Sequence, residues 1–140
     1  MIVFKNALAT ISGCFTGVIV ISLGEYLASN MYPLPADIDF SDKVAVGKAV
    51  AAMPMSAFML LLFMYAVAAF CGAVVATLIS KREQIRPALI AGIVLSCIGI
   101  YATWVIPHPL WFTITDALIF LPAAYLGYVV SRKKTANMVS

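Results

Sequence analysis

The stretch from Pro54 to Ser80, PMSAFMLLLFMYAVAAFCGAVVATLIS, contains no charged side chain. An α-helix rises about 1.5 Å per residue and needs about 20 apolar residues to cross the hydrocarbon core of a bilayer. This stretch is therefore long enough and apolar enough to span a membrane. Three further apolar stretches lie at residues 4–29, 87–106 and 109–131. The sequence predicts an all-α membrane protein built as a bundle of four transmembrane helices.

The composition of the whole chain supports the same class. Of the 140 residues, 64% are hydrophobic and 11% are charged, which is far outside the range of soluble domains. The first apolar stretch is longer than the apolar region of a signal peptide, so we expect it to remain as a span. The expected surroundings are a lipid bilayer. The net charge of +3 comes from basic residues near the span ends and does not indicate a nucleic-acid partner.

The basic residues predict the orientation of the chain. Lys and Arg in short loops near span ends stay on the cytoplasmic side. They cluster at the N-terminus, between the second and third spans, and at the C-terminus: Lys5, Lys81, Arg82, Arg86, Arg132, Lys133 and Lys134. An even number of spans puts these three places on one face. We expect both termini to be cytoplasmic, residues 1–134 to form one transmembrane domain, and residues 135–140 to be a cytoplasmic tail.

The segment at residues 30–53 joins the first two spans on the predicted outer face. Ser41 is placed to cap a short helix that would run to Met53. Helical spacing puts Val46, Ala49, Val50 and Met53 on one face. We expect this helix to lie in the membrane interface with its apolar face against lipid.

Small residues recur at helical spacing along every span. The glycines among them are Gly13, Gly17, Gly72, Gly92, Gly99 and Gly127. In lipid, such residues let helix backbones approach closely. They either pack the four helices of one bundle or present a face, such as Gly13 with Gly17, to a helix of another chain.

Two acidic residues lie inside the apolar spans, and both are candidates for function. Glu25 and Asp116 fall at depths that could meet, and no Lys or Arg is predicted beside them. Ser22 shares a helix face with Glu25, and Thr113 lies three residues before Asp116. Two unpaired carboxylates in one site require either that one be protonated or that a cation lie between them. Alternatively, each is a structural acid: Glu25 reaches interfacial water, and Asp116 bonds a neighbouring helix.

Three residues are candidates for a role at the predicted outer face. His108 lies in the turn before the fourth span, about 12 Å along the helix axis from Asp116, so the two are not expected to share a metal ion. A pairing of His108 with Glu25 and a pH-sensitive contact stay open, beside a purely structural role in the turn. Tyr32 and Trp111 are expected in the aromatic girdle of this face.

Motifs of soluble enzymes are missing from the chain. It contains no Ser/His/Asp order, no P-loop and no dinucleotide fingerprint, and its single histidine excludes a haem held by two histidines. Cys14, Cys71 and Cys97 lie within spans and form no C-x-x-C pair, so neither a disulfide framework nor a thiolate metal site is expected. We expect no enzymatic activity, no cofactor and no metal.

Several short motifs resemble a group of small bacterial four-span membrane proteins. They are Glu25-Tyr26, Tyr32-Pro33, the acidic segment with Asp37 and Asp39, the turn from Ile106 to Phe112, and the run from Phe120 to Gly127. The resemblance implies a place in the bacterial inner (cytoplasmic) membrane. It brings no activity with it.

Two hypotheses for function follow, of which the helix packing favours the first and the second is the alternative. The first is an accessory or structural subunit that docks through its small-residue helix faces, either to further copies of itself or to a larger membrane complex. The second is a small proton- or cation-coupled transporter or channel that uses the intramembrane carboxylates. A common polar cavity at the two acids would favour the second hypothesis. A dry interface in which a hydroxyl caps each acid would exclude it.

Overall fold

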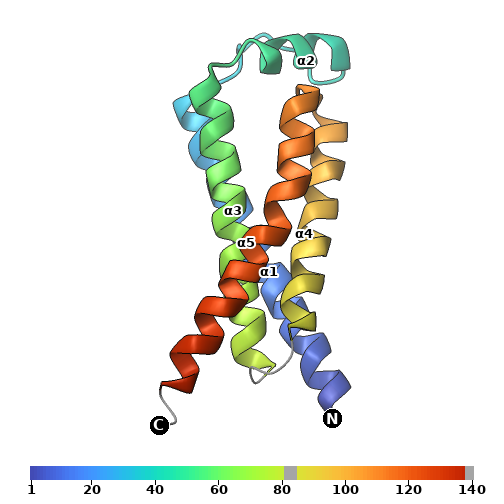
Figure 1. Cartoon of the computed structure of the whole chain (residues 1–140). Helices are drawn as coiled ribbons and strands as arrows, with labels where there is room; N and C mark the ends of the chain where they lie inside the picture. The colour runs from blue at the N-terminus through green and yellow to red at the C-terminus, as the bar shows by residue number, and fades with distance from the viewer. Residues whose placement is uncertain (81–84, 138–140) are drawn as a thin grey trace.

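A computed structural model describes residues 1–80 and 85–137, apart from the side chains of 134–136. Five helices follow one another within these residues: α1 (Ile2–Met31), α2 (Lys43–Ala51), α3 (Met55–Ile79), α4 (Arg86–Val105) and α5 (Leu110–Ala136). Figure 1 shows the four long helices running alongside one another, with the short α2 across one end and both termini at the other. We refer to these as the α2 end and the terminal end.

Prolines lie at the beginnings of α3, α4 and α5. Pro54 has extended dihedral angles (φ −65°, ψ 153°) immediately before α3, and Pro87 lies in the first turn of α4. Pro109 directly precedes α5, and its carbonyl accepts the first backbone bonds of that helix. Proline suits these places because it lacks the N–H that would be unpaired in a first turn.

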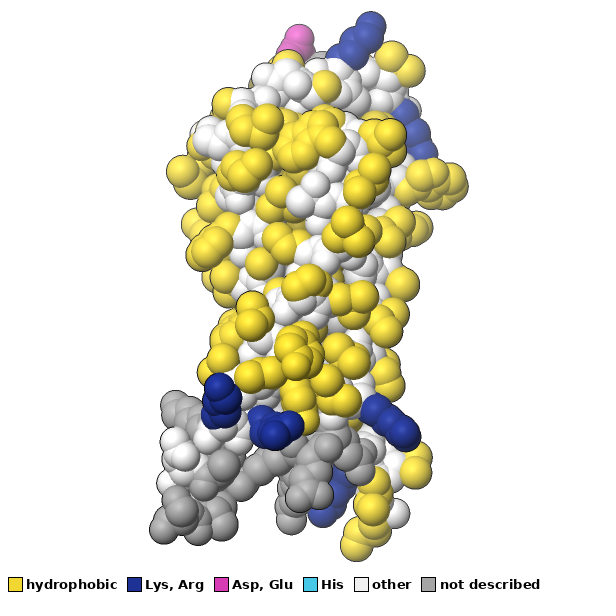
Figure 2. All heavy atoms as spheres, viewed as in Figure 1, with side chains coloured by type: hydrophobic (Ala, Val, Ile, Leu, Met, Phe, Trp, Pro, Cys, Tyr) yellow, Lys and Arg dark blue, Asp and Glu magenta, His cyan; other side chains and the backbone are white. Residues whose placement is uncertain are grey.

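The face of the bundle seen in Figure 2 is mostly apolar along its middle. Figure 2 shows hydrophobic side chains covering the long face, with Lys and Arg side chains confined to the two ends. Each of the four long helices in the described part of the chain has the length and hydropathy to cross a membrane. The prediction of a four-span bundle with a short helix between the first two spans is confirmed, and the chain is a multi-pass membrane protein.

The apolar face of α2 packs onto the protein. Val46 and Val50 are each 3% exposed and belong to the main hydrophobic core. This differs from the predicted contact with lipid. The bundle leaves an open apolar end that these two side chains cover, so α2 closes the bundle as a cap.

The N-cap of α2 also differs from the prediction. The cap is Asp42, whose Oδ1 accepts the backbone N–H groups of Val44 (2.9 Å) and Ala45 (3.2 Å). The N–H of Ser41 instead bonds the side chain of Asp39. The negative charge of a carboxylate at the N-cap also interacts favourably with the positive end of the helix dipole.

The packing changes character along the bundle. α3 contacts α1, α4 and α5. Toward the α2 end the core contains large side chains from all five helices, including Phe58, Tyr65, Leu95, Phe112 and Phe120. A second core cluster consists of smaller groups and one tyrosine: Ala73, Ala88, Ala124 and Tyr128. Small residues let helices approach closely, whereas the larger side chains hold them apart and leave room near the α2 end.

The glycines pack against neighbouring helices of the same chain. An added Cβ at each would meet a partner at close range: Gly13 with Gly72, Gly17 with Leu95, Gly92 with Ala124, Gly99 with Asp116, and Gly127 with Phe70. The face of Gly13 and Gly17, which could have served another chain, is therefore occupied by α3 and α4.

Candidate functional site

Glu25 of α1 is hydrogen-bonded to a tyrosine in the middle of α3. The hydroxyl of Tyr65 donates to Oε1 of Glu25 at 3.2 Å. Tyr65 is 7% exposed, whereas Glu25 is exposed on its other side. Six residues separate Glu25 from the end of α1, which corresponds to about 9 Å of helix. A buried hydroxyl needs a partner, and the carboxylate supplies it.

Asp116 lies in the interior of the bundle, and its carboxyl group forms no hydrogen bond with the residues that the structure describes. Its side chain is fully buried, as are those of Phe112 and Phe120, one helical turn before and after it on α5. Gly99 of α4 faces it so closely that an added Cβ would lie 2.7 Å from Oδ2. Neither carboxyl oxygen finds a partner among the residues that the structure describes. An ionised carboxylate in such a place is costly.

Tyr65 connects the surroundings of the two acids. Its ring stacks on Phe120, with centroids 6.0 Å apart and planes at 21°, and meets the edge of Phe112 at 6.5 Å. Tyr65 therefore packs on the face of α5 that carries Asp116.

A cavity of about 500 Å³ opens beside Glu25 near the α2 end. Its wall is formed by the ends of α1, α3 and α4 together with the segment that follows α1, and it is mostly apolar. Its polar lining residues are Glu25, Ser29, Tyr32, Tyr65, Thr103 and His108. Asp116 is not in this wall. The two predicted acids thus do not face a common cavity. Tyr65 bonds Glu25 and packs on the phenylalanines that flank Asp116 on α5.

His108 forms part of the same wall and is held by two contacts. Its Nδ1–H donates to the carbonyl of Ile106 at 2.6 Å, and its ring stacks on Phe112 at a centroid distance of 5.0 Å. Burial lowers the pKa of His108, against the opposing effects of the Ile106 bond and of the charge on Glu25. The ring is therefore neutral at pH 7. Glu25 and His108 share the cavity, as the sequence left open, without forming an ion pair in the described structure.

The other predicted site residues lie apart from the two acids. Ser22 is exposed on α1 and is not among the residues that line the cavity. Thr113 is half-buried but does not bond Asp116. Tyr32 donates its hydroxyl to Ser56 at 2.9 Å, and Trp111 packs edge-on against Phe58 at 5.4 Å.

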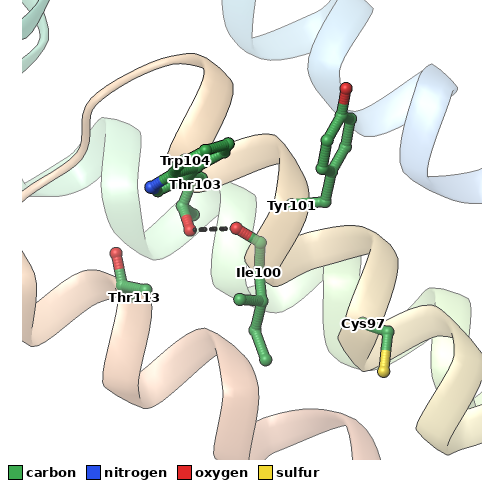
Figure 3. Close-up of a pocket in the computed structure, with 6 residues that line it drawn as sticks. All are labelled: Cys97, Ile100, Tyr101, Thr103, Trp104 and Thr113. Atoms are coloured by element: carbon green, nitrogen blue, oxygen red, sulfur yellow. Dashed lines mark hydrogen bonds between the residues drawn. The ribbon is translucent and has the colours of Figure 1, made fainter.

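A second hollow, of about 460 Å³, lies between α4 and α5. Figure 3 shows Thr103 bonded to the carbonyl of Ile100, at 2.8 Å, with the ring of Tyr101 turned away from Thr113. Trp104 in its wall is 75% exposed, and Lys43 lies 5.5 Å from the centre of the Trp104 ring. None of the six residues drawn is acidic or basic. This hollow therefore lacks the charged group that distinguishes the cavity at Glu25.

Sequence reasoning did not single out Tyr65. The available signal was a phenol hydroxyl in the middle of an otherwise apolar stretch, because such a group must find a partner inside the bundle. No group of three metal-ligating side chains occurs among the described residues.

Comparisons with known proteins do not extend this picture. No family model, no curated protein and no solved structure matches the chain. The resemblance to small bacterial proteins is therefore supported only as far as the four-span arrangement.

Proposed function

We propose that the protein is a small proton-coupled transporter in which Glu25 and Asp116 are the groups that take up and release the proton. The observation that carries the proposal is the position of Tyr65, bonded to Glu25 at the cavity and packed on the Asp116 face of α5. An intramembrane carboxylate without a basic partner is costly and is typical of proton and ion pathways.

The two acids have complementary surroundings for this role. Glu25 is in contact with the cavity, so a proton or a solute can reach it from the α2 end, which we predict to be the outer face. Asp116 is fully buried and has no hydrogen-bond partner within the described part of the chain, and we infer that it holds a proton there. The Tyr65 hydroxyl both donates and accepts. It bonds Glu25 but neither oxygen of Asp116 in the described structure, so we infer that a side-chain movement brings it to Asp116 when a proton passes between the acids.

The competing hypothesis of an accessory subunit relied on free glycine faces. Those glycines pack against helices of the same chain, which removes one argument for docking through them. Its test is the mass of the intact assembly, purified from its native membrane in a mild detergent. A homo-oligomer is the expected result. A different protein present in constant proportion would favour the accessory subunit.

The proton path can be tested without knowing the solute. Infrared spectroscopy of the protein in vesicles resolves the C=O stretch of a protonated carboxyl, and Asp116→Asn identifies the band of Asp116. After transfer to D₂O, we expect this band to shift quickly in the wild type and slowly in Tyr65→Phe. Tyr101→Phe is the matched control, because Tyr101 is exposed on α4. Equal exchange rates in wild type and Tyr65→Phe would contradict the path.

Transport itself is tested in proteoliposomes that enclose a pH-sensitive dye. Under an outside-acid gradient, we expect a solute panel to reveal protein-dependent proton entry that both Glu25→Gln and Asp116→Asn abolish. Proton entry that survives in both variants would show that the carboxylates do not carry it.

A further inference from the structure

We propose that the cavity at the α2 end binds a monovalent organic cation with an apolar body, and that Glu25 is its counter-ion. This inference names the solute class of the proposed transporter, and its biological meaning rests on that proposed function. The binding itself depends only on the cavity.

The charge of the cavity decides the sign of the ligand. Glu25 is the only acidic residue in its wall, and no lysine or arginine of the described chain lines it. His108, the other ionisable group apart from the two tyrosines, is neutral because burial lowers its pKa. An anion would be repelled by Glu25, and a neutral ligand would remove water from the carboxylate without replacing it by an opposite charge.

The geometry of the carboxyl group leaves room for such a contact. Oε1 of Glu25 accepts the Tyr65 hydroxyl at 3.2 Å, which fixes the orientation of the group. Glu25 also lines the cavity, and we infer that its second oxygen, Oε2, contacts the ligand. A charge-assisted contact there would be stronger than in water because the surrounding wall is apolar.

The rest of the wall favours an apolar body over a bare metal ion. The volume of about 500 Å³ lies in the usual range of small-molecule sites. Phe40, Leu34, Met53 and Leu61 supply apolar surface, and the rings of Tyr32 and Tyr65 can face a positive charge. A divalent metal would instead need several oxygen ligands at close range.

Two probes of matched shape and opposite charge test the proposal. Tetraphenylphosphonium and tetraphenylborate are each titrated into the purified protein in mild detergent, with equilibrium dialysis and empty micelles as the blank. We expect the phosphonium to bind and the borate to bind at least about tenfold more weakly, since the two differ in the sign of their interaction with one carboxylate. Equal binding of the two probes would overturn the proposal.

Variants locate the binding in the cavity. Glu25→Gln is expected to weaken phosphonium binding about tenfold or more, while Asp37→Asn, the same change at an exposed acid outside the wall, leaves it unchanged. Ser29→Lys places a positive charge in the wall from an exposed position of α1. It should weaken the phosphonium and strengthen the borate, which a merely misfolded variant would not do. Wild-type phosphonium binding in Glu25→Gln would overturn the assignment.

The outcomes separate this inference from the proposed function. Phosphonium binding that depends on Glu25, together with no solute-coupled proton entry, would keep the cation site and exclude the transporter. Proton entry that depends on both acids, together with equal binding of the two probes, would keep the transporter and exclude the cation site.

Discussion

The backbones of Gly13 in α1 and Gly72 in α3 touch reciprocally: a Cβ added to either glycine would lie 2.6 Å from the carbonyl oxygen of the other. No side chain intervenes at this crossing, so the two helices are as close as their backbones allow. The contact holds α1 against α3, the two helices that carry Glu25 and Tyr65.

Gly13→Ala should therefore destabilise the bundle. The added methyl group meets backbone that cannot move without separating the helices, and overpacking of this kind costs about 1 to 3 kcal/mol. Unfolding in mixed micelles with increasing SDS, followed by circular dichroism, measures the change. Ala7→Leu, on an exposed face of the same helix, is the control and should have little effect. Equal stabilities for Gly13→Ala and wild type would contradict the close crossing.

The capping of α2 gives a second prediction. Asp42→Ala should cost about 1 kcal/mol, the usual value of a lost N-cap, because two backbone N–H groups lose their acceptor. Ser41→Ala should cost little, since its side chain does not cap the helix. The same SDS titration measures both variants. A larger effect from Ser41 than from Asp42 would restore the capping role predicted for Ser41.

Asp116→Leu tests whether the buried acid is retained for function. Leucine has the same branching at Cγ as aspartate, although its methyl groups are larger than the carboxyl oxygens, and it removes a polar group that lacks a partner in the described structure. We expect the free energy of unfolding to rise, by up to about 1 to 3 kcal/mol, the usual cost of an unpaired buried polar group. Proton entry in vesicles should be lost in the same variant. A marked loss of stability would mean that the carboxyl group holds the fold together.

The titration of His108 gives a prediction about pH. The unfolded chain protonates this imidazole near its ordinary pKa, whereas the folded chain does so only at lower pH. Between the two values the unfolded state binds more protons, so acidification through this range destabilises the fold. We expect Tm to fall more between pH 7.5 and 5.5 in the wild type than in His108→Asn, whose amide can keep the bond to Ile106. The carboxyl groups are the same in both proteins, so their contribution to the change in Tm cancels in this comparison. An equal fall of Tm in the wild type and in His108→Asn would exclude a neutral, half-buried His108.

The class of fold followed from the sequence because lipid offers backbone groups no partner. A long apolar stretch such as Pro54 to Ser80 has to satisfy its own hydrogen bonds as a helix, and local composition alone decides this. A charge inside a membrane is costly, so the sequence alone also indicated Glu25 and Asp116 as candidate functional residues. The glycine spacing indicated close packing, but which helix each glycine meets could not be derived from it.

Only the tertiary structure decided what these residues contact. Glu25 and Tyr65 lie 40 positions apart in the chain, and nothing local pairs them. Whether α2 rests on lipid or on the bundle depends on how far the aromatic core holds the helices apart at that end. The sequence by itself determined the helices and the cost of their buried charges, because both depend on single residues and the surrounding solvent. The cavity, the bond between Glu25 and Tyr65 and the burial of Asp116 depend on which helix faces pack together, which only the folded bundle defines.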